Sequence, residues 1–211
     1  MTVDFKKQDK ALYQPKTTPG IIDVPEMTFI MVDGSGDPNT SAAYSNALEI
    51  LYGLSYAIKM SKIGGAQPEG YYDYVVPPLE GLWRHKDGGA AIDLSDKDSF
   101  CWTSMIRQPE FVTPEAFEFF KTVLAKKKPE LDLSPARLAK FTEGLCVQVM
   151  HIGPYDDEPA TIAAMERYAN ENGYAFDLSA ARRHHEIYLA DPRKTAPEKL
   201  KTIIRYPARK A

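Results

Sequence analysis

One pattern of strands and prolines occurs twice in this chain, and it limits the folds that the chain can adopt. The segments SFCWTSMIRQPEFVTPEAFEFF (99–120) and HHEIYLADPRKTAPEKL (184–200) both carry an apolar stretch that runs into a proline turn. The prolines at these turns, Pro109 and Pro192, lie 83 residues apart, and a second proline follows each of them five residues later. Proline is favoured at the first position of a helix, so each copy predicts a strand, a turn and then a helix. The repetition predicts a fold that is built from two similar halves.

The remaining apolar segments complete this plan. Apolar runs between turn residues predict strands, and an N-cap residue before an apolar period of 3.6 predicts a helix. The predicted strands are 27–32, 71–76, 79–84, 100–106, 146–151 and 185–189, and the predicted helices begin near 40, 114, 158 and 197. Residues 1–23 carry charges, two prolines and a glycine, and we expect them to form an arm without a regular element.

Strands and helices that alternate with hairpin-length connections favour an α+β fold. We expect residues 24–211 to form one domain of two tandem halves related by a pseudo-twofold axis. The first half would span about 24–128 and the second about 143–211. Their antiparallel sheets would join edge to edge, with helices on one side and a concave ligand groove on the other.

Charge and hydropathy exclude several classes of partner. The 26 basic and 29 acidic residues give a net charge of -3, whereas proteins that bind nucleic acid concentrate Lys and Arg. The first residues lack an apolar run that could act as a signal peptide or a membrane anchor. We therefore expect a cytoplasmic protein that binds neither nucleic acid nor membrane. The sequence does not indicate its oligomeric state.

The strand at 184–189 carries a glutamate between apolar and aromatic residues. Because side chains alternate between the two faces of a strand, His184, Glu186 and Tyr188 are expected on one face and Ile187 on the other. We expect Ile187 to pack on the helices and Glu186 to point into the open groove. A carboxylate on such a strand costs free energy when it is buried without a partner, so it often has a functional role. The alternative is an edge strand whose polar face is simply wetted by solvent.

A second candidate carboxylate, Glu80, stands next to a glycine and three residues before Trp83. It suits a pocket wall, and it equally suits a charge in a turn. Aromatic residues are the candidate ligand contacts, although aromatic side chains fill cores more often than ligand sites. The aromatic candidates are Tyr72, Tyr74, Trp83, Trp102, Tyr155 and Tyr188.

Other kinds of site find little support. The adjacent histidines lack a third ligand at a recognisable spacing, so no metal site is expected. The turn at 34–36 lacks the GxGxxG and GxxxxGK patterns of phosphate loops, and the chain has no GxSxG motif.

Three segments together resemble the GyrI-like small-molecule-binding family, and they are most similar to its stand-alone members that hydrolyse cyclopropanoid antibiotics. These segments are YDYVVPPLEGLW (72–83), WTSMIRQP (102–109) and HEIYLADPRKTAPEKL (185–200). The resemblance implies a fold of two SHS2 modules side by side, with lipophilic aromatic or cationic ligands in the groove between them. It also implies that the functional acid is the glutamate on the last strand of the second module, which is Glu186.

The resemblance further implies a reaction. An aromatic slot of Trp83, Trp102 and Tyr72 or Tyr74, with Glu80 and His184 nearby, would hold a flat spirocyclopropane dienone. Glu186 would act as base on a water molecule that opens the cyclopropane, and Tyr155 or Tyr188 would donate a hydrogen bond or position the water. No cofactor is required.

Two other functions remain open at this point. A non-catalytic protein that sequesters or senses drugs would use the same groove, with Glu186 paired to a ligand cation. An interaction protein could instead take a peptide in the groove.

Overall fold

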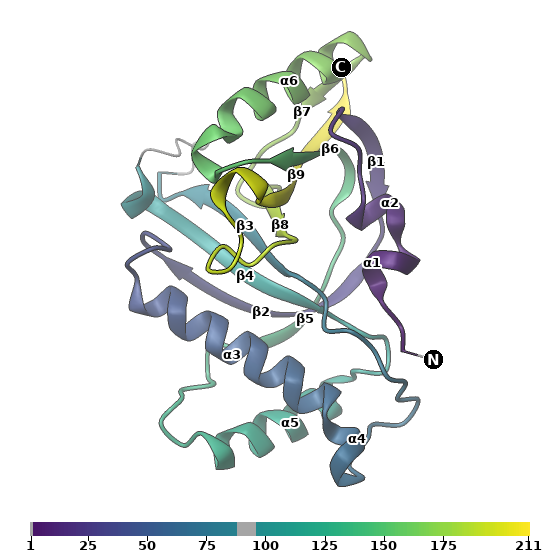
Figure 1. The fold of residues 1–211 in the computed structure, drawn as a ribbon, viewed down its shortest axis with the longest axis vertical. Coiled ribbons are helices and arrows are strands. Elements are labelled where there is room, and N and C mark those ends of the chain that lie inside the picture. Colours follow the sequence, from purple (N-terminus) through teal and green to yellow (C-terminus); the bar gives the residue numbers. More distant parts are fainter. Residues whose placement is uncertain (1, 88–95) are drawn as a thin grey trace.

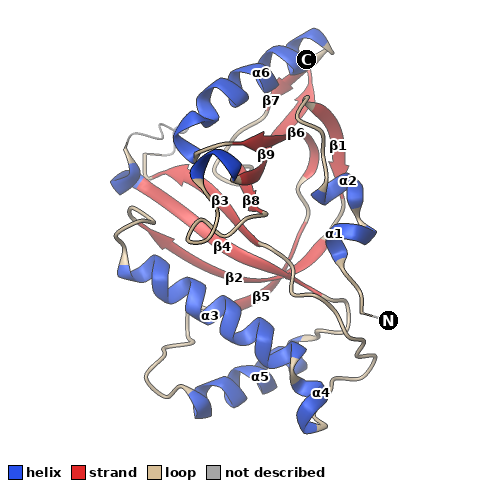
Figure 2. Ribbon diagram, viewed as in Figure 1, coloured by secondary structure: helices blue, strands red, loops and turns tan. Residues whose placement is uncertain are grey.

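The computed structural model describes residues 2–87 and 96–211, and within them nine strands form one antiparallel sheet (Figures 1 and 2). The strands are β1 (Gly20–Val24), β2 (Met27–Ser35), β3 (Leu79–His85), β4 (Phe100–Gln108), β5 (Arg137–Phe141), β6 (Gly144–Ile152), β7 (Tyr174–Phe176), β8 (His184–Tyr188) and β9 (Lys201–Lys210). Their order is β1-β6-β9-β8-β3-β4-β2-β5, and β7 also pairs with β9.

This order is mirrored about the pairing of β3 with β8. The first half runs β2, α3, β3, β4 along the chain, and the second runs β6, α6, β8, β9. In the sheet, β3-β4-β2 extends from one side of the junction and β8-β9-β6 from the other. Each half therefore has the same order of strand, helix, strand and strand. The exact limits proposed for the arm (1–23) and for the two halves stay a prediction.

The helices are α1 (Phe5–Gln8), α2 (Lys10–Tyr13), α3 (Ala42–Lys59), α4 (Ser61–Gly64), α5 (Pro114–Lys127) and α6 (Glu158–Glu171), with short 3-10 turns η1 (Lys97–Ser99), η2 (Tyr155–Asp157) and η3 (Pro197–Lys199). No helix in the described ranges is long and apolar enough to span a membrane.

Local sequence explains where α3 and α5 begin. The side chain of Ser41 accepts a hydrogen bond from the backbone N–H of Tyr44 and caps α3, and Thr113 caps α5 in the same way, with Pro114 at the first helical position. Along α3, buried residues recur at the helical period, from Ala47 to Ile58. They pack on β2 and β4, while α6 packs on β6.

Helices α3 and α6 cover one face of the sheet, and the N-terminal segment covers the other. The hydroxyl of Tyr13, at the end of α2, donates to the buried carboxylate of Glu80 at 3.2 Å. Arg205 on β9 donates to the backbone oxygen of Leu12 at 2.5 Å. The expectation that residues 1–23 lack regular elements is therefore wrong: two short helices and β1 form, because buried polar groups of the sheet bind their backbone.

Two predicted elements differ from the structure. The helix expected from Pro197 is only the turn η3, and residues 201–210 form β9, which pairs with β6 and β8. The strand of Glu186, β8, is therefore not the last strand of the second half, as had been expected. Residues 71–76 make a single bridge, from Tyr74 to Val3, instead of a strand. The other predicted strands lie within β2, β3, β4, β6 and β8, although the strand expected to end at 189 ends at 188.

The 83-residue repeat does not mark equivalent elements. It aligns β4 with β8, whereas the mirrored order of the sheet makes β4 the counterpart of β9 and β3 the counterpart of β8. β4 leads to a helix, and β8 leads across η3 into another strand. The order of elements repeats along the chain, but the proline pattern misplaces the register of that repeat.

Candidate active site

The side chains of β8 alternate as expected, but they face the opposite layers. His184 and Glu186 lie opposite Trp83 and Gly81 of β3, on the face that α3 and α6 cover. Ile187 points to the other face, towards the N-terminal segment, so the expectation that it packs on the helices is wrong. Both faces of the sheet are covered here, and Glu186 is consequently only 7% exposed. The open sheet face that was expected to form the groove is covered by the N-terminal segment.

His184, Glu186 and Glu158 form a buried cluster on this face. Nε2 of His184 lies 2.7 Å from Oε1 of Glu186 and 4.0 Å from Oε2 of Glu158. Glu158 opens α6, and the helix carries it over β8, where it is completely buried. Two carboxyl groups and an imidazole therefore share one enclosed space.

The surroundings of the cluster indicate its charge. Burial, followed by the nearby charges of Glu186 and Asp156, raises the pKa of Glu158 well above its usual value. Neither carboxyl oxygen of Glu158 has a hydrogen-bond partner among the described residues, and Nδ1 of His184 has none either. A proton on Nε2 lets His184 donate to Glu186 without burying an unpaired N–H on Nδ1. The cluster thus combines Glu158, which burial favours in its neutral form, with a Glu186 carboxylate that accepts a hydrogen bond from His184.

Aromatic rings surround Glu186. Nε1 of Trp83 donates to the hydroxyl of Tyr188 at 3.0 Å, and the ring of Tyr155 meets the ring of Tyr188 edge to face at 5.9 Å. Tyr44, near the start of α3, lies 5.9 Å from the ring of Trp83. These four side chains come from β3, β8, η2 and α3, and we call them the aromatic wall.

A glycine makes room for this wall. Gly81 lies directly opposite Glu186, and a Cβ atom there would stand 2.6 Å from Nε1 of Trp83 and 3.1 Å from the hydroxyl of Tyr188. Any side chain would displace the tryptophan and break its bond to Tyr188. The geometry of the site therefore requires a glycine at position 81.

The tyrosines of the wall keep their protons at neutral pH. Burial and then the charge of Glu186 raise the pKa of Tyr155 to about 12. The same two causes raise the pKa of Tyr188 and of Tyr44, and Tyr188 is also hydrogen-bonded to Glu186. Each hydroxyl is consequently a hydrogen-bond donor next to a carboxylate acceptor.

Of the predicted site residues, the structure brings together Glu186, His184, Tyr188, Tyr155 and Trp83. Trp102 lies next to this group because its ring contacts Tyr44 at 5.0 Å. It is nevertheless only 2% exposed and fills the space above Gly34, where a Cβ atom would stand 2.2 Å from the ring. Trp102 supports the wall from the core.

The other predicted residues lie elsewhere. Glu80 is on the opposite face of the sheet, where it bonds His185 at 3.0 Å. The ring of Tyr74 is completely buried beneath α3. Neither can reach Glu186, because the sheet or the core separates them.

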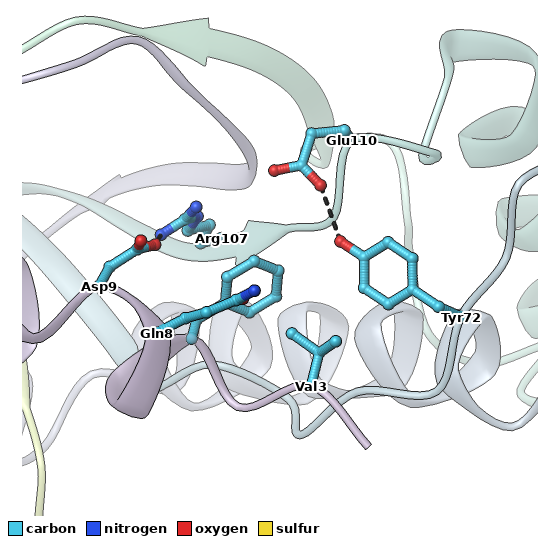
Figure 3. A pocket seen from close by; sticks show the side chains of 7 residues that line it. Val3, Gln8, Asp9, Tyr72, Arg107 and Glu110 are labelled. Atoms are coloured by element: carbon cyan, nitrogen blue, oxygen red, sulfur yellow. Dashed lines mark hydrogen bonds and ion pairs between the residues drawn. The ribbon is translucent and has the colours of Figure 1, made fainter. Parts of the chain in front are cut away.

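Tyr72 borders a different cavity of about 370 Å³, shown in Figure 3. Its hydroxyl donates to Glu110 at 2.7 Å, and Arg107 and Asp9 pair across the same cavity at 2.6 Å. A second cavity, of about 400 Å³, lies beside α3 and is bordered by Trp102. Neither of these two cavities is lined by Glu186.

Two members of the site were not predicted, Glu158 and Tyr44. Acidic residues are common in the first turn of helices for electrostatic reasons, so a glutamate at this position gives no cue. Tyr44 lies in the first turn of α3, close to the residue that caps the helix, and an aromatic residue at such a position usually packs against a neighbouring element. Only the three-dimensional arrangement shows that Glu158 lies against His184 of β8 and Tyr44 against Trp83 of β3.

The cluster was also tested as a metal site. Glu158, His184 and Glu186 each offer one ligand atom, and these atoms lie within 4.8 Å of one another. A histidine that binds a metal usually donates through its other ring nitrogen to a partner that orients it. Nδ1 of His184 has no such partner among the described residues. The arrangement suits proton sharing better than metal binding.

Comparison with known proteins agrees with this fold. The family model for the GyrI-like small molecule binding domain matches residues 17–209. A crystal structure of a hydrolase from Listeria innocua shares 48% identity over 99% of this chain and 100% of that chain, with a TM-score of 0.90. An uncharacterized conserved protein from the same organism shares 50% identity over 99% and 100% of the two chains, with a TM-score of 0.94.

A more distant structure shares the fold alone. The C-terminal domain of EcmrR is 13% identical over 92% of this chain and 98% of that domain, with a TM-score of 0.53. A comparison with curated proteins gave no significant match. From the family match and the close structural relatives, the chain belongs to the GyrI-like small-molecule-binding family.

Proposed function

We propose that this protein binds lipophilic aromatic small molecules against the aromatic wall and hydrolyses cyclopropanoid DNA-alkylating compounds. One observation carries the proposal: the carboxyl group of Glu186 is hydrogen-bonded to His184 and lies among tyrosine and tryptophan rings. The family binds small molecules, and a relative with 48% identity is described as a hydrolase, which supports a reaction at this site.

The proposed reaction needs one base and one hydrogen-bond donor. A water molecule attacks the cyclopropane CH₂ and passes a proton to Glu186, so that a C–O bond forms as a ring C–C bond breaks. The electron pair of the broken bond enters the dienone ring, which becomes a phenolate and then takes a proton. The hydroxyl of Tyr155 or Tyr188 donates to the oxygen on which the negative charge develops. The sum of these steps adds one water to the substrate.

The wall would hold the flat alkylating unit. Trp83 and Tyr44 replace the slot of Trp102, Tyr72 and Tyr74 that was expected from the sequence, because those three side chains lie in the core or at another cavity. Exposed aromatic residues continue along α3: Tyr52 is 38% exposed and Tyr56 49% exposed, and their rings stack at 6.4 Å. They offer a surface for the rest of an extended aromatic ligand. Hydrolysis before the compound reaches DNA would be a protective reaction of the cytoplasm.

The alternative function is binding without reaction. The enclosure of aromatic rings and one carboxylate also suits a cationic aromatic ligand, which would pair with Glu186. This version predicts that the ligand leaves the protein unchanged.

The test is turnover of a duocarmycin-type cyclopropanoid, followed by liquid chromatography and mass spectrometry. The wild type is expected to add one water to the free compound. Glu186→Gln keeps the shape and removes the base, so its rate should fall about 10²- to 10⁴-fold. Glu171→Gln, at an exposed position on α6, is the matched control and should keep the wild-type rate. Compound recovered intact from the wild type supports the binding function, and equal rates for wild type and Glu186→Gln reject the assignment of the base.

A further inference from the structure

Glu158 is a buried acid for which the reaction above has no use. It is completely buried, and both of its carboxyl oxygens lack a hydrogen-bond partner among the described residues. A buried ionised carboxylate without a partner is strongly disfavoured, and a shorter or apolar side chain would avoid that cost. The position of Glu158 therefore requires an explanation beyond packing.

The groups that face Glu158 leave it no stable way to be ionised. The titratable side chains around it are His184, Glu186, Tyr188, Tyr206, Tyr155 and Asp156. Among these, only His184 could become a cation, and its Nε2 lies 2.7 Å from Glu186 against 4.0 Å from Glu158. Because Glu186 is nearer, it receives the hydrogen bond from the Nε2–H of His184. Glu158 receives none, so of the two carboxyl groups it is the one that keeps a proton.

We propose that Glu158 is a positioning residue that keeps the site at a single negative charge, by holding a proton while Glu186 is ionised. The role in turnover rests on the proposed hydrolase function. Glu158 acts through His184: while Glu158 is neutral, the Nε2–H of His184 belongs to Glu186 and orients the carboxylate that receives the proton of the attacking water. If Glu158 loses its proton, two carboxylates compete for His184. Both then face the single Nε2–H of the neutral imidazole, so Glu186 no longer has this donor to itself and loses its fixed orientation.

Infrared spectroscopy tests the proton directly, without any substrate. The spectrum of wild type minus Glu158→Gln at pH 7 should contain a C=O band of a protonated carboxylic acid, and wild type minus Glu171→Gln should contain a carboxylate band instead. The wild-type band should vanish in alkaline solution, which requires no variant to fold. A carboxylate band for Glu158 at pH 7 overturns the proposal.

The pH dependence of turnover tests the positioning role. Wild type should lose activity at alkaline pH, where Glu158 ionises, whereas Glu158→Gln mimics the protonated acid permanently. This variant should keep the rate at pH 6 within about threefold and should lack the alkaline decline. Parallel profiles for wild type and Glu158→Gln, or loss of activity in Glu158→Gln at every pH, overturn the role. If wild type forms no product at any pH, the hydrolase function fails and the positioning role with it, while the infrared band still decides where the proton lies.

Metal binding is the competing explanation for the same cluster. Zn²⁺ or Mn²⁺ added to the wild type should leave its melting temperature unchanged. A rise of several degrees that is absent in Glu158→Gln would show that the site takes a cation in place of the proton, and would overturn the proposal.

Discussion

The strand β8 carries two histidine–carboxylate clusters, one on each face, and they differ in how many of their polar atoms are paired. On the helical face, His184 bonds Glu186, while both oxygens of Glu158 lack a hydrogen-bond partner within residues 2–87 and 96–211. On the other face, His185 lies between Glu80 and Glu143, at 3.0 Å from each. That second cluster is extended by further partners, whereas the first ends at the aromatic wall.

The extra partners turn the second cluster into a closed network. Arg205 reaches Glu143 at 3.4 Å and Gln148 at 3.0 Å, and Tyr13 donates to Glu80. One oxygen, Oε1 of Glu143, remains without a partner among the described residues. Since Gln148 and Arg205 also bind backbone oxygens of α2 and its vicinity, this network attaches the N-terminal segment to the sheet.

The two clusters differ in their roles: the closed network stabilises the fold, whereas the open cluster offers groups for a reaction. Opposite charges in close contact stabilise the ionised forms of the closed network, so removing one partner should cost stability. The open cluster contains an acid that burial favours in its neutral form, and it faces rings that a ligand could contact. Adjacent histidines on one strand thus serve different purposes because alternation sends them to different layers.

The largest expected effect comes from breaking the closed network. Glu143→Ala leaves Arg205 without its buried counter-ion and His185 with Glu80 alone, and we expect it to lower the free energy of unfolding by about 3–5 kcal/mol. Urea denaturation measures this, with Glu171→Ala as the control on an exposed site. A loss below about 1 kcal/mol would mean that the network is not what stabilises this face.

Raising the pH should weaken the same network by a smaller amount. The carboxylates of Glu143 and Glu80 outweigh burial and raise the pKa of His185 to about 9. The stability that its charge contributes is complete below about pH 6.5, the usual pKa of histidine, and is lost as the pH rises through 9. The loss should reach about 3 kcal/mol at most.

Glu158 also makes stability depend on pH over part of the same pH range, and the variant Glu158→Gln separates its contribution from that of His185. The pKa of Glu158 is raised by burial, so its contribution also declines as the pH increases from about 4.5 towards its folded-state pKa. Melting curves of Glu158→Gln should retain the loss between pH 6.5 and 9 and should lack the earlier one. If Glu158→Gln and wild type give parallel curves from pH 5 to 9, the charge assigned to the open cluster is wrong.

At acid pH the sign is reversed. Burial opposes the ionisation of Glu143, but His185 and Arg205 outweigh it and lower its pKa to about 2. Its contribution is present above about pH 4.5 and is lost as the pH falls towards 2. Stability from the closed network should therefore be greatest between about pH 4.5 and 6.5.

The smallest expected effect concerns the contact between the N-terminal segment and Glu80. Tyr13→Phe removes only the hydroxyl that donates to the carboxylate, and it should cost about 1.5 kcal/mol. Protease digestion should then cleave near α2 faster than in the wild type, while turnover per folded molecule stays the same. A large drop in turnover would mean that the two clusters are coupled through β8.

Much of the fold could be predicted from the sequence because apolar runs and caps are local signals. The strands β2, β3, β4, β6 and β8 and the helices α3, α5 and α6 follow from such signals. The last strand could not be predicted, since Leu200, Ile203 and Ile204 suit a helix spacing as well as a buried strand. The proline motif before them also matched the start of α5, and pairing with β6 and β8 decided the outcome.

Only those features of the candidate site that follow from the alternation of side chains along a strand could be predicted. Alternation places His184, Glu186 and Tyr188 on one face, but it does not say which layer covers that face, and the helices do so here. The pairing register of β3 with β8 places Gly81 opposite Glu186. The neighbouring residue, Glu80, therefore points to the other face of the sheet and belongs to the other cluster. The same limit explains why Glu158 was missed, since it reaches the site only through the packing of α6.

The central claim is that Glu186 activates water in the open cluster, and one measurement tests it most directly. Excess protein is mixed with a duocarmycin-type cyclopropanoid in ¹⁸O water for a single turnover, and both product and protein are analysed by mass spectrometry. Attack by water predicts that the new hydroxyl of the product carries ¹⁸O and that Glu186 does not. Unlabelled product together with ¹⁸O in the peptide that contains Glu186 would instead show direct attack by the carboxylate, and would contradict the assignment of Glu186 as base.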